Sequence, residues 1–445
     1  MRNVVSDLRP MIRMGLTLLL AALLGGCVGG PAWPGFQSPP ATPTQPPSPP
    51  ETPTKPSPTL APTLTPLPTK GPVATSTPVA LCTFGPPVPP EPGPSLDAYV
   101  FSEPSVVLTH TSGIGIIGWL PDGQNLLITR LSSNGSTESI RTFNVIERTE
   151  KGYGEWGGFS IGFNPKPVWL NAISAVAFAD DMADQQIGLY IAQGDGSLPQ
   201  VVVADLTYRF IAASPTGDRV VFFAQSAKGQ PEIYNTSQEQ VQTFPFQLPF
   251  TQRYGAGVYH AVWHPDGNRI GFYSNAGFYL ADVNTGQICE IDLGTKYGGK
   301  RWAAGAQWSP NGHYLAALTT VGEPAVRFID LTIIDMGSGE QRRLNLGHQY
   351  LHLITWSPNS RDLLVIAQTE PAQIKGDSYS LYLVNANTGE SRHMLSDHPF
   401  VFAGIWGVAW SPNGQEIALA CPTTDPAGTT IREGQLCLIS VEVGR

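Results

Sequence analysis

The sequence of 445 residues has few charged side chains: Asp, Glu, Lys and Arg make up 14% of it, against about 25% in an average globular protein. Basic residues are the scarcer kind, because 26 Lys and Arg stand against 35 Asp and Glu and leave a formal net charge of −9. A protein that binds nucleic acid needs clustered Lys and Arg to neutralise phosphates. Nucleic acid is therefore excluded as the expected partner.

The sequence also lacks several motifs on which catalytic and metal sites commonly rest. It contains no His-Glu-x-x-His pair, no Cys-x-x-Cys pair, no Walker loop and no EF-hand spacing. His348 and His352 have the spacing of two zinc ligands on a helix, but they precede a predicted strand, so we expect no metal there. The pattern favours a protein that is not an enzyme and uses no cofactor.

No apolar run near the N-terminus reaches the roughly 20 residues of a membrane span; the longest is Leu16 to Leu24. Arginines precede this run, and small residues follow it, as in a signal peptide over residues 1–26. Leu24-Gly-Gly-Cys27 resembles a bacterial lipobox, which implies that Cys27 becomes the lipidated first residue of the mature protein. We expect an extracytoplasmic, lipid-anchored protein of a bacterial membrane. An ordinary secretory signal or a short membrane anchor is the alternative.

Residues 27–94 lack hydrophobic periodicity and are rich in proline: 23 of the 42 prolines lie between Pro31 and Pro94, mostly beside Thr, Ser or a second Pro. Such a segment cannot build a core, and it favours extended polyproline II conformations. We predict a disordered Pro/Thr-rich stalk that links the lipid to a folded domain over residues 95–445.

A short motif recurs after residue 95. It consists of a Trp, once an Ala, followed in most copies by Ser-Pro, then Asp, Asn or Thr, then Gly. The copies begin at Trp119, Ala213, Trp263, Trp308, Trp356 and Trp410. Trp169 lies near the middle of the one long gap, and counting it gives seven units spaced by 44 to 54 residues.

Each unit predicts four β-strands. Its Pro, Asp or Asn, and Gly suit the turn of a hairpin, and apolar or alternating segments such as Tyr314–Leu318 and Gly277–Val283 follow as second and third strands. No unit has a helical period. We therefore predict an all-β fold, a β-propeller of four-stranded blades, with seven blades favoured and six as the alternative.

The Trp-Ser-Pro-Asn-Gly repeats, together with Gly229-Gln-Pro-Glu-Ile-Tyr234 at the start of a third strand, resemble the TolB-like propellers related to WD repeats. The resemblance covers roughly residues 97–445. It implies an exported protein that binds proteins or small ligands on one face and has no catalytic activity as a bare propeller. The sequence departs from the family in three places: the second unit has lost the motif, Ser360 replaces a turn glycine, and we count seven units where TolB-type domains have six.

The last unit supplies only three strands before the sequence ends at Arg445. Ser105–Thr109 is a spare strand ahead of the first unit's inner strand, Ile114–Trp119. We predict that this spare strand pairs with the last unit's third strand and closes the ring, which would remove an exposed sheet edge.

One of the five cysteines, Cys27, is the expected site of lipidation. Cys421 and Cys437 fall in neighbouring strands of the last unit and predict a disulfide, with two buried thiols as the alternative. Pairing of Cys82 with Cys289 would tie the end of the stalk to the fourth unit, and the sequence leaves that pairing open.

The motif tryptophans have a fixed place at the ends of the inner strands, which favours packing between blades over sugar binding. The segments that link one blade to the next instead combine aromatic and basic side chains, as an interface requires. We take these as the candidate partner-binding residues: Arg253, Tyr254, Tyr297, Lys300, Arg301, Trp302, His348, Tyr350, His398 and Trp406.

The sequence therefore predicts a membrane-anchored propeller that acts as a protein-binding scaffold in the cell envelope. Binding of a cell-wall glycan or small ligand in the funnel is one alternative. A hydrolase is another, although it would need paired acids, and among the linking segments Asp397 is the main one. The resembling propellers of the prolyl oligopeptidase type owe their activity to a hydrolase domain that follows the propeller.

Overall fold

The computed structural model describes most of the chain after residue 78, and all described residues belong to one compact unit, Ala74–Arg445. The predicted signal peptide, Cys27 and most of the predicted stalk lie outside them. The described residues are 79–85, 94–131, 138–157, 166–182, 186–227, 230–246, 248, 260–274, 277–296, 299–321, 330–344, 346, 350–368, 379–395, 407–421, 423–424 and 431–444.

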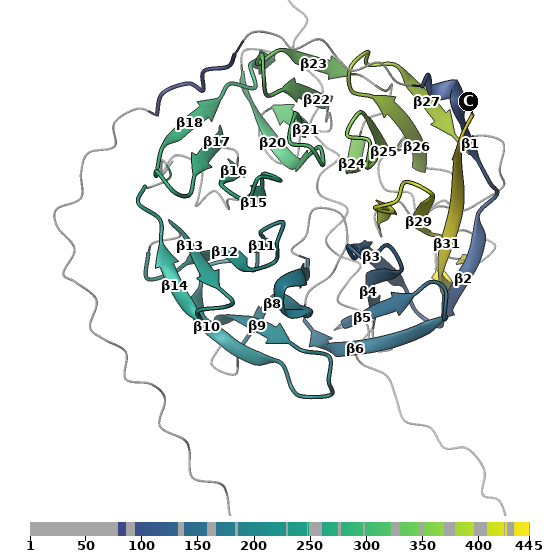
Figure 1. Cartoon of the computed structure of the whole chain (residues 1–445), viewed down its shortest axis with the longest axis horizontal. Coiled ribbons are helices and arrows are strands. Elements are labelled where there is room, and N and C mark those ends of the chain that lie inside the picture. Colours follow the sequence, from purple (N-terminus) through teal and green to yellow (C-terminus); the bar gives the residue numbers. More distant parts are fainter. Residues whose placement is uncertain are drawn as a thin grey trace, which may run out of the picture. The chain divides into compact units, whose positions relative to one another are not determined.

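The described strands form antiparallel sheets arranged around a common centre, as in a β-propeller (Figure 1). Four of these sheets contain the strands of one sequence unit each, in chain order from the centre outward. They are β3 (Ile114–Trp119), β4 (Asn125–Leu131), β5 (Glu138–Asn144) and β6 (Thr149–Trp156); β15 (His260–Trp263), β16 (Arg269–Ser274), β17 (Gly277–Asp282) and β18 (Ile288–Ile291); β19 (Thr295–Lys296), β20 (Gly299–Trp308), β21 (Tyr314–Val321), β22 (Asp330–Asp335) and β23 (Gln341–Leu344); β24 (Tyr350–Trp356), β25 (Asp362–Gln368), β26 (Tyr379–Asn385) and β27 (Ser391–Met394).

A larger sheet contains eight strands and corresponds to two sequence units. Its two halves, β7 to β10 and β11 to β14, are joined by a single residue pair, Leu206 with Ala224. The predicted second unit lies in the first half, with Trp169 in its inner strand. The strands are β7 (Val168–Leu170), β8 (Ala175–Asp181), β9 (Ile187–Ala192) and β10 (Gln200–Leu206); β11 (Ala212–Ala213), β12 (Arg219–Ala224), β13 (Gln230–Asn235) and β14 (Gln240–Thr243).

The two ends of the folded unit meet in one sheet and close the ring. This sheet contains β28 (Val408–Trp410), β29 (Glu416–Ala420), β30 (Thr423–Thr424) and β31 (Ile431–Val443), and β31 pairs with β2 (Ser105–His110) and with β1 (Tyr99–Phe101).

The register runs from Ser105 opposite Leu438 to His110 opposite Gly434, so the predicted pairing of the spare strand with the last unit is confirmed. The two segments approach so closely there that a Cβ at Gly434 would clash with the carbonyl oxygen of Ser112.

The turn after each inner strand explains the repeated motif. At Gly312 the backbone has a φ of +73°, which an L side chain rarely adopts. Ser360 occupies the equivalent place with a φ of 62°, and its hydroxyl accepts the Asn311 N–H of the neighbouring turn at 3.0 Å. The serine therefore offsets its backbone strain with a hydrogen bond between sheets that glycine cannot make.

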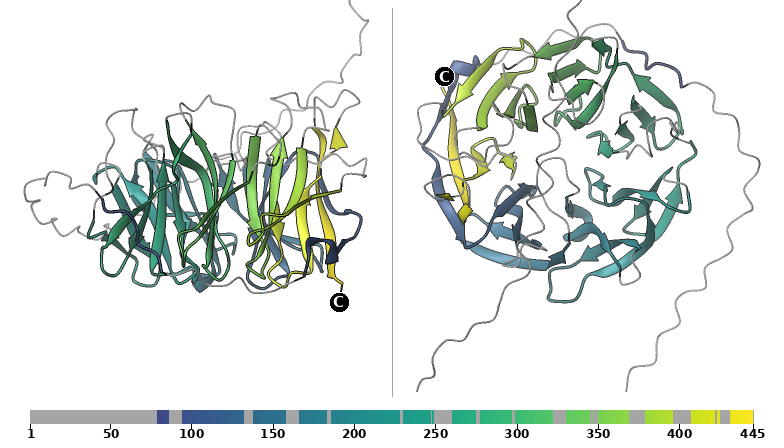
Figure 2. Two further views of the ribbon diagram at one scale, coloured as in Figure 1. Left: turned by 90° about the horizontal axis from the view of Figure 1, so that it is seen from above. Right: turned by 180° about the vertical axis from the view of Figure 1, so that it is seen from behind.

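Packing of the folded unit begins ahead of the expected boundary at residue 95. Cys82 forms a disulfide with Cys289 of β18, and its N–H donates to the carbonyl of Glu290 at 2.9 Å. Residues 79–85 and 94–101, which we call the N-terminal belt, then contact successive sheets at the outer edge of the ring (Figure 2). The short helix η1 (Leu96–Ala98) lies in the belt, and η2 (Asn171–Ile173) follows β7. Among the described residues no helix is long and apolar enough to cross a membrane.

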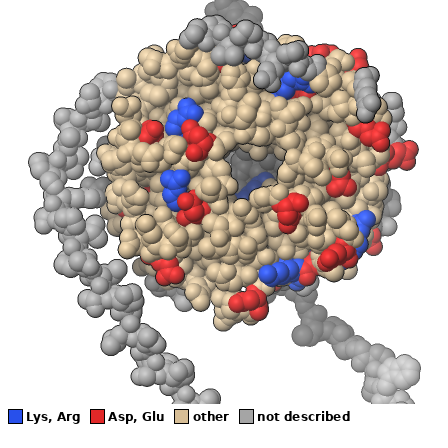
Figure 3. Space-filling model, viewed as in Figure 1, with Lys and Arg blue, Asp and Glu red and all other residues tan. Residues whose placement is uncertain are grey.

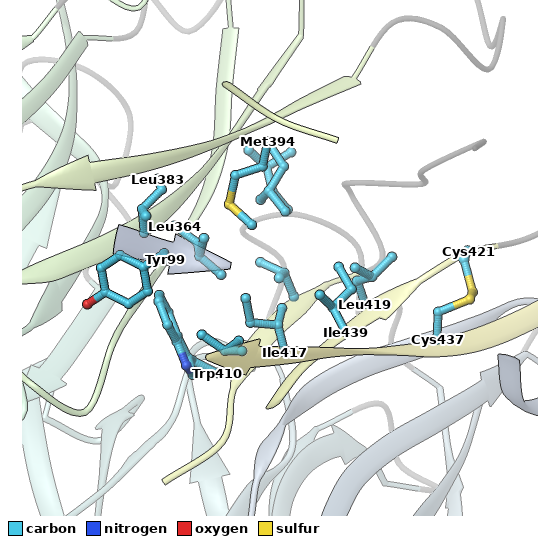
Figure 4. Packing of buried hydrophobic residues seen from close by; sticks show 14 of the residues in the cluster. Tyr99, Leu364, Leu383, Met394, Trp410, Ile417, Leu419, Cys421, Cys437 and Ile439 are labelled. Carbon is cyan, nitrogen blue, oxygen red and sulfur yellow. A yellow bond between two sulfur atoms is a disulfide. The ribbon is translucent and has the colours of Figure 1, made fainter. Parts of the chain in front are cut away.

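The belt ends in a buried polar contact. The Tyr99 hydroxyl donates to Asp362 at 2.6 Å, and this fully buried carboxylate also accepts from Asn359 at 2.9 Å and from Asn385 at 3.1 Å. Burial and the nearby carboxylate raise the pKa of Tyr99. Below this contact Tyr99 packs with Trp410 in an apolar cluster, and the predicted disulfide between Cys421 and Cys437 lies at its edge (Figure 4).

We expect Tyr99→Phe to lower the free energy of unfolding by about 1.5 to 3 kcal/mol, because a buried carboxylate would lose one of its donors. Urea denaturation measures this loss. Tyr190→Phe is the control, since its hydroxyl bonds the Asp181 carbonyl at an exposed position. Equal stabilities of the two variants would show that the contact does not hold the belt.

Candidate functional site

The predicted binding residues belong to the links between sheets. In a meander of four antiparallel strands the second and fourth strands run in the same direction, so every link from an outer strand to the next inner strand begins at the same face of the ring. We call this the link face. The turns after the inner strands lie on the opposite face, the hairpin face, and the strands run between the two (Figure 2).

The described residues contain only part of the predicted set. Lys300, Arg301 and Trp302 were expected in a link, but they lie within β20, where Trp302 is paired with Thr320. Tyr350 is the first residue of β24 and pairs with Gln368. The other predicted residues lie outside the described ranges: Arg253, Tyr254, Tyr297, His348, His398 and Trp406.

The motif tryptophans are packing residues, as predicted. Four of them donate their indole N–H to a backbone carbonyl in the inner strand of the preceding sheet, at 3.0 to 3.3 Å. The pairs are Trp119 with Ala409, Trp263 with Ala212, Trp308 with Val262 and Trp356 with Gln307. Trp410 instead donates to Gly414 of its own turn at 3.1 Å. The indole N–H groups of the motif tryptophans are thus engaged by contacts within the protein.

The inner strands surround a central cavity of about 600 Å³. Figure 3 shows its opening as a hole in the ring, with a basic side chain visible inside. Most of the lining comes from the strands β3, β15, β20, β24 and β28 and from the residues ahead of β7 and β11. Lys166 is the one Lys or Arg among the described lining residues, and that lining includes no carboxylate.

His260 lies on the cavity wall, between two other aromatic rings. Its ring centroid is 3.9 Å from that of Phe210 and 5.2 Å from that of Tyr273. Burial lowers the pKa of His260 to about 4, so the imidazole is neutral near pH 7. His264, in the next turn, contacts the carbonyl of Gly312 at 3.1 Å. His260 thus belongs to the inner strand β15, and His264 belongs to the turn that follows it.

A second hollow of about 330 Å³ lies beside β5, β6 and β7. Its lining includes Asp122, Glu150, Tyr153 and Trp169, but these acids are already engaged. The Asp122 carboxylate accepts the N–H groups of Gln124 and Asn125, and Glu150 pairs with two arginines. A third acid of the lining, Glu147, is exposed and accepts from the Thr149 hydroxyl at 3.5 Å.

No group of three or more His, Cys, Asp or Glu is placed to hold a metal ion among the described residues. His348 and Asp397 lie outside those residues. The sequence also contains Gly158-Phe-Ser160-Ile-Gly162, a Gly-x-Ser-x-Gly spacing, and it too lies outside the described residues.

The fold defines the chain as a β-propeller, and the solved structures similar to it include TolB proteins. A putative TolB from Agrobacterium tumefaciens is 14% identical over 52% of this chain and 80% of that one, with a TM-score of 0.39. TolB from Acinetobacter baumannii is 15% identical over 71% and 79%, with a TM-score of 0.38.

A puromycin hydrolase is also similar, at 15% identity over 71% of this chain, with a TM-score of 0.44; the match spans about half of the hydrolase. No known protein family and no curated protein matches the sequence.

The buried His260 predicts a pH dependence of stability. In the folded protein this imidazole has a pKa of about 4, whereas in the unfolded chain it takes up a proton near pH 6.5. The free energy of unfolding therefore falls as the pH drops from about 6.5 to about 4. Between pH 7 and pH 5 this single group should cost about 2 kcal/mol.

We expect His260→Phe, which keeps an aromatic ring beside Phe210, to remove that part of the loss. Urea denaturation at the two pH values measures it, and His393→Phe, which removes an exposed histidine, is the control. If His260→Phe lost as much stability as the wild type between pH 7 and pH 5, the imidazole would not be buried as described.

Proposed function

We propose that this protein is an extracytoplasmic, lipid-anchored β-propeller that binds another protein through its link face and has no enzymatic activity of its own. The observation that carries the proposal is the strand order. The segments that combine aromatic and basic side chains all begin at the same face, because each connects an outer strand to the next inner strand. A rigid ring that gathers such segments on one face has the form of a binding platform.

The proposed ring has seven blades. Two features support this number: the eight-stranded sheet divides into two meanders that share one residue pair, and the tryptophan contacts repeat from one inner strand to the next. The contact of Trp119 with Ala409 repeats that geometry between the first and last units of the sequence.

The proposed location outside the cytoplasm is supported by the cysteines. Besides Cys27 the chain has four, and all four are joined in disulfides, one of them between neighbouring strands and one fastening the belt to β18. Disulfides persist in oxidising compartments. The lipobox-like sequence at Cys27 supports attachment to the membrane by lipid.

The test is a comparison of two variants of the full-length protein, purified in detergent and incubated with solubilised envelope proteins. One carries Ala at Tyr254, Arg301, Trp302 and His348. The other carries Ala at four exposed positions in turns on the hairpin face: Ile146, Leu198, Gln238 and Glu340.

We expect the wild type and the hairpin-face variant to retain the same partner protein and the link-face variant to lose at least nine tenths of it, at matched melting temperatures. Reconstitution with the purified partner then confirms direct binding. Equal retention by both variants would place the interface elsewhere on the ring.

A further inference from the structure

One position of the repeat, three residues before the motif tryptophan or its equivalent, surrounds the central cavity. We call these residues the channel row: Ile116, Lys166, Phe210, His260, Gly305, Leu353 and Gly407. All except Leu353, whose side chain is not described, line the cavity. A single sequence position therefore sets the chemistry of the cavity wall.

The channel row is uneven around the ring. Lys166, Phe210 and His260 come from consecutive units and lie on one stretch of the wall, whereas Gly305 and Gly407 contribute no side chain to it. At Gly407 a Cβ would clash with the carbonyl oxygen of Ile116. Gly118 leaves room, because a Cβ built on it would meet nothing within 4 Å. The cavity thus has a basic and two aromatic side chains on one part of its wall, and glycines on other parts.

The Lys166 amine is partly buried, and its positive charge favours an anionic ligand. Burial lowers its pKa to about 8, and the attraction of Glu138 offsets that shift only in part. Glu138 is itself buried in β5 and does not line the cavity. At pH 6.5 the ammonium is charged and incompletely hydrated, and a carboxylate entering from the cavity would stabilise it.

The neighbouring wall suits a flat apolar group. The His260 ring is tilted by 58° to the Phe210 ring and stacks at 10° on the Tyr273 ring. His260 is neutral, so it adds aromatic surface without a second charge. Aromatic rings bind preferentially in offset or edge-to-face arrangements with such surfaces. The volume of about 600 Å³ lies within the range of small-molecule sites, roughly 300 to 1,000 Å³.

Gln307 provides a third feature of the cavity. Its side-chain oxygen is buried and has no hydrogen-bond partner among the described residues, while its backbone carbonyl is occupied by Trp356. A buried polar atom without a partner costs free energy unless a ligand or water satisfies it. Gln307 lies two positions beyond Gly305 on β20, so it borders the open side of the cavity.

We propose that the central cavity is a binding site for a small aromatic carboxylate. The carboxylate pairs with the Lys166 ammonium, the aromatic body packs on Phe210 and His260, and the Gln307 side chain serves a polar substituent. This site is separate from the proposed protein interface, and its test involves no partner protein, so either proposal can fail alone.

The test uses 2-naphthoate and its uncharged analogue 2-naphthamide, titrated calorimetrically into the full-length protein at pH 6.5 in one detergent, so that binding to micelles is common to all samples. We expect naphthoate to bind at least tenfold more tightly than naphthamide. Lys166→Met should remove that preference, and Lys166→Arg should retain it.

Gly118→Leu fills the cavity and should abolish naphthoate binding. Gly152→Leu is the control: it makes the same change in β6, also where a Cβ meets nothing within 4 Å, and should leave naphthoate binding unchanged. Melting temperatures identify any variant that fails to fold. The proposal is overturned by equal binding of the two probes, by an unchanged preference in Lys166→Met, or by no naphthoate binding at millimolar concentration.

Discussion

The pairing of β31 with strands from the start of the folded unit is the constraint on which the rest of the structure depends. A ring of sheets has no free edge between units only if its first and last units share a sheet, and here β2 and β1 complete the sheet that β28, β29 and β31 begin. The tryptophan contact from Trp119 to Ala409 then repeats across the junction what Trp263 and Trp308 do elsewhere. The central cavity exists because the inner strands are held in this closed arrangement.

The N-terminal belt extends this closure to the outer edge of the ring. It is fastened covalently at Cys82, and at its other end the Tyr99 hydroxyl reaches the buried Asp362. Arg392 donates to the carbonyls of Leu96 and Tyr99, at 3.0 and 2.9 Å, so both ends of η1 are held by the neighbouring sheet. The belt therefore adds a covalent and a hydrogen-bonded connection to the contacts that already join adjacent sheets.

Much of the fold could be predicted because the repeat carries its own turn chemistry. The motif located the inner strands, and Trp169 located the unit that had lost it. β1 could not be predicted, since three residues between prolines show no alternation; its place is set by Asp362 and Trp410, which are distant in sequence. The same holds for Cys82, whose partner is fixed by the path of the belt.

The site could be predicted only in part. Aromatic and basic residues in links suggested a face, but β20 begins earlier than its motif indicates and includes Arg301 and Trp302. Lys166 gave no signal, because it precedes the unit without the motif and becomes notable only beside Phe210 and His260 on the cavity wall. The role of such a repeat position can be recognised only after the ring has brought its copies together around the cavity.

The most direct test of this account is the unfolding free energy of the full-length chain without residues 95–112, measured with and without a synthetic peptide of that sequence. We predict that the deletion abolishes cooperative unfolding and that the peptide restores it by pairing with β31. A deletion variant that unfolds with the free energy of the wild type, with no response to the peptide, would contradict the closure of the ring by its two ends.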